Sequence, residues 1–182
     1  MKKSLFLLLI ISLMFLGVPK SYAQDNAATP SAIASIDYPL PYPGILPDNP
    51  LYFMKALRDK VVSFFISDPL KKAEFDLLMA DVRLNAAQYL FVKGENKYSL
   101  AETTISKGEN YFYDSLVKIS NAKQQGMPVN DLVSKLIIAS QKHQQVIRDL
   151  ESKTSGSVKD RLMEDERRAK AFENRSMQFK AN

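Results

Sequence analysis

The sequence predicts an all-α fold, an antiparallel helical bundle or an extended array of helical hairpins, with about five helices preceded by a proline-rich arm. Helix-capping residues, glycines and prolines divide residues 50–182 into five segments. Within these segments apolar residues recur at steps of three and four, the spacing of one face of a helix. The chain has no cysteine, so packing rather than disulfide bonds must stabilise this fold.

The N-terminus has the organisation of a secretory signal peptide over residues 1–23. Two lysines give it a basic start, and an almost wholly apolar run follows over residues 4–18. Ser21 and Ala23 place small residues where a signal peptidase recognises its substrate, which predicts cleavage between Ala23 and Gln24. The alternative is an uncleaved membrane anchor, but the apolar run is shorter than the ~20 residues that span a bilayer. The chain is therefore expected to be secreted, periplasmic or otherwise extracytoplasmic, with no stable membrane insertion after cleavage.

Two segments without helical spacing precede the helical domain. Residues 24–37 are rich in alanine, serine, threonine and asparagine, a composition typical of a flexible leader. Residues 38–49 form a proline-rich arm, because each proline fixes φ and favours extended geometry in the residue before it. The arm is either a free segment for the aromatic groove of a partner or, as its many apolar side chains favour, a segment packed on the chain's own helices. These side chains are Tyr38, Leu40, Tyr42, Ile45 and Leu46.

The first two of the five expected helices begin with the same signal, an N-cap residue followed by proline. Asn49 before Pro50 predicts a first helix that runs to about Ile66. Asp68, also before a proline, predicts a second helix that ends at Gly94. The loop between them is so short that the second helix must turn back on the first.

The third and fourth helices have comparable boundary signals. Ser99 and Glu102 have the spacing of a capping box, which predicts the start of a third helix that ends at Gly126. A fourth helix is expected from about Asn130 to about Lys153. A glycine just beyond it then ends the helix.

Between these boundaries, apolar residues spaced by three and four line one face of each helix; we call such a line a seam. The second helix alternates large and small seam residues, which lets a neighbouring helix approach closely. Gly108 predicts a kink in the third helix, because glycine costs about 1 kcal/mol relative to alanine in a helix interior. The fifth helix, from Ser157 to about Phe179, is the most polar and is expected to be peripheral or partly extended. The seam residues of the second, third and fourth helices are Leu70, Ala73, Leu77, Ala80, Leu84, Ala87 and Phe91; Ala101, Ile105, Gly108, Phe112, Leu116, Ile119 and Ala122; and Leu132, Leu136, Ala139, His143, Val146 and Leu150.

Three short stretches near the start of the helical domain are distinctive. The run LPDNPLYFMK occupies residues 46–55, and DPLKKAE and MADVRL follow at 68–74 and 79–84. Together they resemble an uncharacterised bacterial family of exported or membrane-anchored helical proteins, domain of unknown function 5667, over residues 38–92. The resemblance implies paired helices behind a signal peptide or a single membrane anchor, and a sensory or partner-binding role. It implies no catalytic residue.

No catalytic, cofactor or metal site is expected. The single histidine, His143, lies on an apolar seam, where such a residue is typically packed and hydrogen-bonded, so His143→Leu is expected to change stability by less than about 1.5 kcal/mol. Zinc and copper sites need several histidine or cysteine ligands. The twenty acidic residues are all expected on exposed helix faces or at caps, which makes a hydrolase that uses carboxylates alone the least favoured function.

The charge distribution argues against a nucleic-acid partner. The whole chain has a net charge of +5, but removal of residues 1–23 leaves 22 basic against 20 acidic residues. These are mixed along the helices rather than gathered into a basic face.

The expected function is therefore binding rather than catalysis. The sequence favours an exported, non-catalytic envelope or extracellular module for protein–protein interaction or scaffolding, with an unidentified protein partner and with homo-oligomerisation open to it. The alternative is an extracytoplasmic sensor domain for a small ligand or for envelope stress. An exposed apolar strip would favour the interaction module, and an apolar pocket with convergent polar groups would favour the sensor. The aromatic residues belong either to a broad core or to an exposed patch for a protein or a cell-wall polymer; they are Phe53, Phe64, Phe65, Tyr89, Phe91, Tyr98, Tyr111, Phe112 and Tyr113.

Overall fold

The computed structural model describes residues 35–181. Within this range the chain forms five α-helices and one short 3₁₀-helix, with no strand, so the all-α prediction is confirmed. The elements are α2 (Tyr52–Phe65), α3 (Pro69–Val92), η1 (Glu95–Lys97), α4 (Tyr98–Gln124), α5 (Asn130–Glu151) and α6 (Gly156–Ala181). The expected signal peptide and its cleavage site between Ala23 and Gln24 lie outside the described residues, as does most of the leader.

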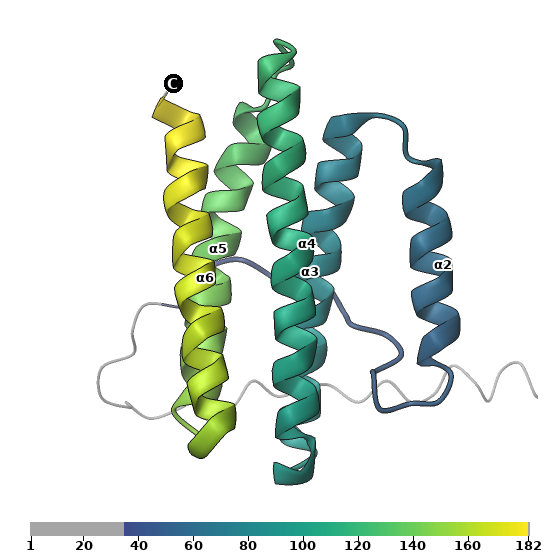
Figure 1. The fold of residues 1–182 in the computed structure, drawn as a ribbon, viewed down its shortest axis with the longest axis vertical. Coiled ribbons are helices and arrows are strands. Elements are labelled where there is room, and N and C mark those ends of the chain that lie inside the picture. Colours follow the sequence, from purple (N-terminus) through teal and green to yellow (C-terminus); the bar gives the residue numbers. More distant parts are fainter. Residues whose placement is uncertain (1–34, 182) are drawn as a thin grey trace, which may run out of the picture. The chain divides into compact units, whose positions relative to one another are not determined.

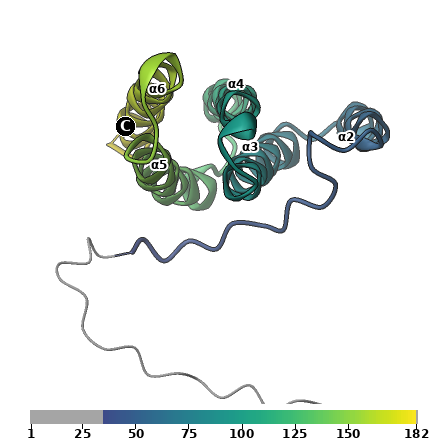
Figure 2. The same ribbon diagram turned by 90° about the horizontal axis from the view of Figure 1, so that it is seen from below.

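Two helical hairpins make up the main body of the described part of the chain. α3 packs along α4 and α5 packs along α6, and these are the two most extensive helix–helix interfaces. α4 also contacts α6, and α3 contacts α5, so the hairpins join into a four-helix body (Figures 1 and 2). α2 lies to one side of this body, beyond α3 (Figure 2). None of the described helices is long and apolar enough to cross a membrane.

The predicted seams form the core of this body. Nearly every seam residue of α3, α4 and α5 is buried, which confirms the predicted faces, and Leu70 at the start of α3 is partly buried. Two apolar clusters result, one around Phe112 and one around Ile105. The ring of Phe112 stacks on that of Phe172 from α6, with 5.1 Å between their centroids.

The helix boundaries follow the predicted residues at both ends of α3 and depart from them at the starts of α2 and α4. Asp68 caps α3, with its Oδ1 accepting a hydrogen bond of 2.9 Å from the Lys71 backbone N–H. Gly94, with φ +112°, follows the end of α3 as expected. The Asn49 side chain instead accepts from the Leu51 N–H at 2.8 Å in a turn, and α2 begins at Tyr52.

The capping box predicted at Ser99 is wrong. α4 begins one residue earlier, directly after η1, and has no side-chain cap. Glu102 is buried and accepts a hydrogen bond of 2.7 Å from Arg161 on α6. The pattern failed because a helix that continues from a 3₁₀ turn has few free N–H groups to cap, which leaves the carboxylate for a tertiary contact.

The predicted kink at Gly108 is also wrong, since α4 is continuous through this position. Gly108 is buried against α3, where an added Cβ would lie 3.2 Å from both the Ala80 carbonyl oxygen and the Arg83 Cβ. The glycine therefore serves close helix packing, and its contact with α3 offsets its low helix propensity.

The fifth helix, α6, is an integral part of the body rather than a peripheral element. It extends over Gly156–Ala181 without a break and packs on both α5 and α4. Leu162 and Ala169 are fully buried, and Phe172 is 7% exposed. The prediction from its polar composition was wrong because several polar residues of α6 are themselves buried, among them Asp165, Glu173 and Ser176.

The proline-rich segment runs in extended form across the helices. The side chains of Tyr38, Leu40 and Leu46 pack against the apolar clusters, whereas Tyr42 and Ile45 are exposed. Carbonyl groups of the arm accept hydrogen bonds from the helices: Asn85 donates to Pro41 at 2.8 Å and Lys55 to Pro43 at 2.6 Å.

Candidate functional site

A buried polar network centred on His143 crosses the four-helix body. The imidazole is 1% exposed. Its Nε2 lies 3.0 Å from Asp81 Oδ1 on α3, and its Nδ1 lies 2.9 Å from Glu109 Oε1 on α4. Burial alone would lower the pKa of His143, but the hydrogen bonds and negative charges of Asp81 and Glu109 outweigh it and raise the pKa from 6.5 to about 9. His143 is thus a cation at neutral pH that joins three helices.

The network extends to the proline-rich arm. The hydroxyl of Tyr38 donates to Asp81 Oδ2 at 2.5 Å, so that both oxygens of this carboxylate are bonded. Burial and the charge of Asp81 raise the pKa of Tyr38 above its usual range, and the phenol keeps its proton. One carboxylate therefore links the arm to the centre of the body.

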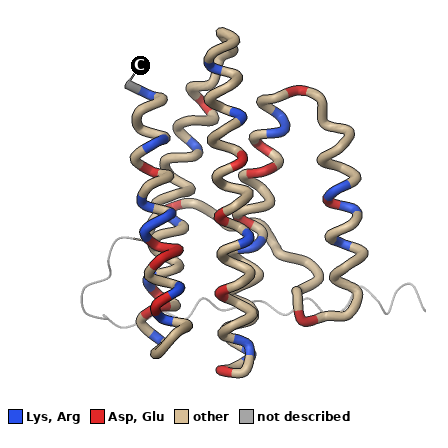
Figure 3. Tube along the Cα trace, viewed as in Figure 1, with Lys and Arg blue, Asp and Glu red and all other residues tan. Residues whose placement is uncertain are grey.

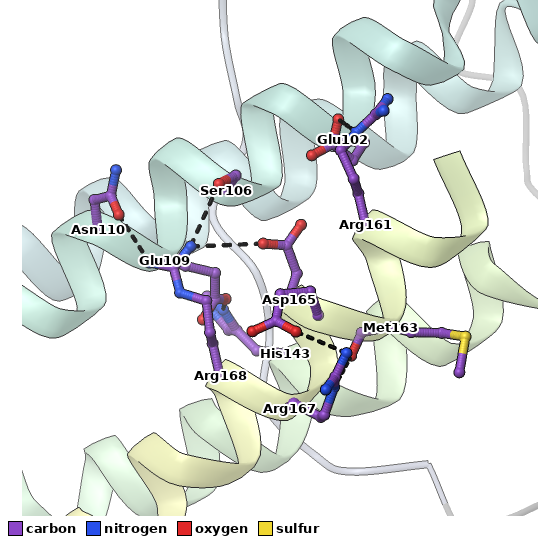
Figure 4. Close-up of polar contacts among 11 residues, drawn as sticks. Glu102, Ser106, Glu109, Asn110, His143, Arg161, Met163, Asp165, Arg167 and Arg168 are labelled. Carbon is purple, nitrogen blue, oxygen red and sulfur yellow. Dashed lines mark hydrogen bonds and ion pairs between the residues drawn. The ribbon is translucent and has the colours of Figure 1, made fainter. Parts of the chain in front are cut away.

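A third carboxylate, Asp165 on α6, lies on the Glu109 side of the network. Asp165 is 3% exposed, and burial raises its pKa to about 7, an effect to which the charges of Glu109 and Glu102 add. Glu109 Oε2 and Asp165 Oδ2 are buried and have no hydrogen-bond partner. Arg168 lies 3.6 Å from Asp165 and donates to Ser106 and Asn110 on α4 (Figure 4).

The expectation that all acidic residues lie on exposed faces or caps is wrong. Seven acidic residues are buried: Asp59, Asp76, Asp81, Glu102, Glu109, Asp165 and Glu173. For four of them the spacing along the helix was informative. Asp76, Asp81, Glu109 and Asp165 each lie three or four residues from apolar seam residues on both sides, a spacing that favours the buried face.

The network holds the helices of the body together. Its imidazole and carboxylates are closed to solvent, and the hydrogen bonds of His143 and Tyr38 each join different elements. Across residues 35–181 no group of three or more histidine, cysteine, aspartate or glutamate residues is arranged to hold a metal ion. The network fixes the relative positions of α3, α4, α5 and the arm.

α2 presents a different surface, with an unusual distribution of polar and apolar side chains. The residues that face the body are polar or small: Asp59 is buried, and Tyr52, Lys55, Ala56 and Ser63 are partly buried. α2 has no extensive interface with any other described helix. A helix that belonged to the core would bury its apolar side instead.

Most of the apolar side of α2 faces away from the body, although Met54 also borders α3 and the arm. We call this surface the outward strip; it consists of Phe53, Met54, Leu57, Val61, Val62, Phe64 and Phe65. Phe64 and Phe65, at 80% and 75% exposure, are the most exposed of them. Contiguous large apolar side chains of this kind mark a binding surface when they occur on a folded protein.

An open cleft of about 670 Å³ separates α2 from α3, with the arm along one side. Its lining is mainly apolar, from the arm residues 41–45, Met54 on α2 and Leu78 on α3. The charged residues in the lining, Lys55 and Arg58, are already bonded to the Pro43 carbonyl and to Asp59. The cleft thus extends the apolar surface of α2 and offers few free polar groups.

The aromatic residues divide between the two expected locations. Phe91 and Phe112 are buried in the core, whereas the three phenylalanines of α2 are strongly exposed. Tyr89 and Tyr113 are half-exposed. Sequence spacing could not separate the two groups, because the amphipathic pattern of α2 gives no indication of which side meets the body.

Comparison with known proteins agrees with this picture of a helical domain without an assigned site. A family model described as Domain of unknown function (DUF5667) matches residues 44–157, which is more than half of the chain and spans α2, α3, α4 and α5. No curated protein and no solved structure matches the chain. The chain belongs to the DUF5667 family.

Proposed function

We propose that this protein is an exported, non-catalytic helical module that works by docking through the outward strip of α2. The observation that carries the proposal is the orientation of this helix. Lys55, Asp59 and Ser63 face its own body, whereas its large apolar residues are exposed to solvent. Burial of each large apolar side chain is worth about 1.5–3 kcal/mol, so this exposure is costly unless another surface covers it.

The four-helix body acts as the scaffold in this proposal. The His143 network and the α3–α4 packing hold α3 rigid, and α3 carries α2 through a turn of three residues. Lys55 ties α2 to the arm. A rigid body that displays one apolar helix is the arrangement used in recognition by amphipathic helices.

Export rests on the sequence of residues 1–23, with a basic start, an apolar run and small residues before Gln24. Such a chain would meet its docking surface in the cell envelope or outside the cell. N-terminal sequencing of the exported protein is expected to begin at Gln24, and an intact Met1 on membrane-bound material would contradict export by cleavage.

A sensor for a small ligand is the second candidate, because the cleft between α2 and α3 is large enough for one. The polar groups of this cleft argue against a sensor for a small ligand. Lys55 and Arg58 are bonded within the chain, and a ligand would have to displace these bonds to be recognised.

A photoreactive amino acid at position 57 tests the docking function. Leu57 is 60% exposed on the outward strip, and a matched probe at Met163, 44% exposed on α6, serves as the control. Irradiation of producing cells should give covalent adducts from position 57 and few from position 163. Equal labelling from both positions, or none from position 57, would contradict docking through α2.

A further inference from the structure

We infer that the surface on which α2 docks is an anionic lipid bilayer, with the helix lying flat in the headgroup region. The inference rests on the proposed docking function and names its partner. It is distinct from a membrane-spanning anchor, because the 14 residues of α2 extend over about 21 Å, less than the ~30 Å of a hydrocarbon core.

The shape of the strip fits a planar apolar medium. Its side chains extend from Phe53 at one end of the helix to Phe65 at the other, so the whole length of α2 can enter a surface at once. Helices that lie in a membrane interface bury such a face by about 5–10 Å and carry phenylalanine and leucine on it. The position of α2 at one side of the body leaves this face free to approach a plane (Figure 2).

The charges around the strip favour an anionic surface. Over residues 52–72, which cover α2 and the start of α3, five basic residues stand against two acidic ones. Both acids are engaged within the chain: Asp59 is buried and accepts from Arg58, and Asp68 caps α3. Lys60 and Lys71 are exposed. Figure 3 shows the positions of the basic and acidic residues along α2. Each basic residue close to an anionic membrane contributes about 1 kcal/mol of attraction.

A second copy of the chain fits this surface less well. Two-fold pairing places the same surface of both copies in contact, which would bring the basic residues beside the strip close to those of the partner copy. The two acids within residues 52–72, Asp59 and Asp68, are already bonded. An anionic bilayer supplies the missing counter-charge.

Tryptophan fluorescence tests this inference directly, because the chain contains no tryptophan. The chain from Gln24 onward keeps every described element, and Phe64→Trp places a reporter on the strip. Tyr113→Trp, at a half-exposed position on α4, is the matched control. With vesicles of phosphatidylcholine and phosphatidylglycerol, emission from position 64 should shift to the blue, and emission from position 113 should stay unchanged.

Vesicle binding should depend both on the apolar side chains of the outward strip and on the basic residues beside it. The pair Leu57→Glu and Val61→Glu should weaken vesicle binding at least about tenfold, because two large apolar groups no longer enter the bilayer. The pair Met163→Glu and Met177→Glu makes the same change of charge on α6 and should bind as the parent does. High salt, or vesicles of phosphatidylcholine alone, should weaken binding as well.

The outcomes separate this inference from the docking function. Failure to bind anionic vesicles, or equal binding to neutral ones, overturns the inference of an anionic bilayer. If the probe at position 57 then forms adducts with a protein, docking stands with a protein partner. A blue shift that depends on protein concentration and needs no vesicles would assign the strip to a second copy.

Discussion

His143 is the residue whose role changes most once the structure is known. Its seam position predicted a packed, hydrogen-bonded residue, and it is buried between Asp81 and Glu109. Helical spacing places Asp81 and Glu109 on buried faces of their own helices, but it does not show that both carboxylates meet the imidazole. A neutral replacement therefore leaves two buried negative charges without their cation, which is a far larger perturbation than the loss of one packed ring.

His143→Leu is accordingly expected to destabilise the protein by about 3–5 kcal/mol, the cost of breaking a buried ion pair, rather than by the small amount expected from sequence. Chemical denaturation measures the change. Lys135→Leu, at an exposed position of the same helix, should stay within about 0.5 kcal/mol. A loss for His143→Leu no larger than that for Lys135→Leu would show that the network contributes little.

The buried titratable groups also predict how stability depends on pH. The folded-state pKa of Asp165 is raised to about 7 and that of His143 to about 9. A raised pKa stabilises the fold below the unfolded value, and this contribution is lost as pH rises through the folded value. For Asp165 the loss falls between about pH 4 and 7, and for His143 between about pH 6.5 and 9.

The melting temperature should therefore decrease as the pH rises from 5 to 9. Asp165→Asn should flatten the curve below pH 7 and leave the decrease between pH 7 and 9, which belongs to His143. Thermal unfolding followed by circular dichroism in a series of buffers checks this prediction. A melting temperature that rises over this range would contradict the assignment of both groups.

At the scale of elements, the seams and the Asp68 cap could be predicted because they depend on local spacing and local hydrogen bonds. The roles of Glu102 and Gly108 could not be predicted, because they depend on residues elsewhere in the chain. Glu102 is bonded to Arg161, 59 residues away, and Gly108 lies against Ala80 of another helix. The side of α2 that meets the body could not be predicted either. The sequence of an amphipathic helix fits a core helix and an exposed docking helix equally well.

The proline-rich arm is expected to stabilise the fold through its contacts with the helices. Deletion of residues 24–47 removes the packing of Tyr38, Leu40 and Leu46 and the bond from Tyr38 to Asp81. The melting temperature should fall by at least about 5 °C, because each kcal/mol shifts it by about 2–4 °C in a protein of this size. Calorimetry of the truncated chain measures the shift. An unchanged melting curve would mean that the arm is free, and would make it a recognition segment.

At the scale of the whole molecule, a cohesive body is combined with one helix whose apolar side no other described helix covers. The body is cross-linked by buried ion pairs and packed seams, and α2 has no extensive interface with its helices. The family match includes α2 together with α3, α4 and α5, so α2 belongs to the family's domain. Because the four-helix body has its own packed core, α2 can expose its apolar side while the body stays folded.

Amide hydrogen exchange of α2, with and without envelope membranes from the producing cell, tests the central claim most directly. In the isolated chain from Gln24 onward, α2 should exchange faster than α3, because it makes few contacts with the body. Addition of the membranes should slow exchange in α2 and leave α3 unchanged. If α2 is as protected as α3 in the isolated chain, and membranes change nothing, then the helix is part of the core and does not dock.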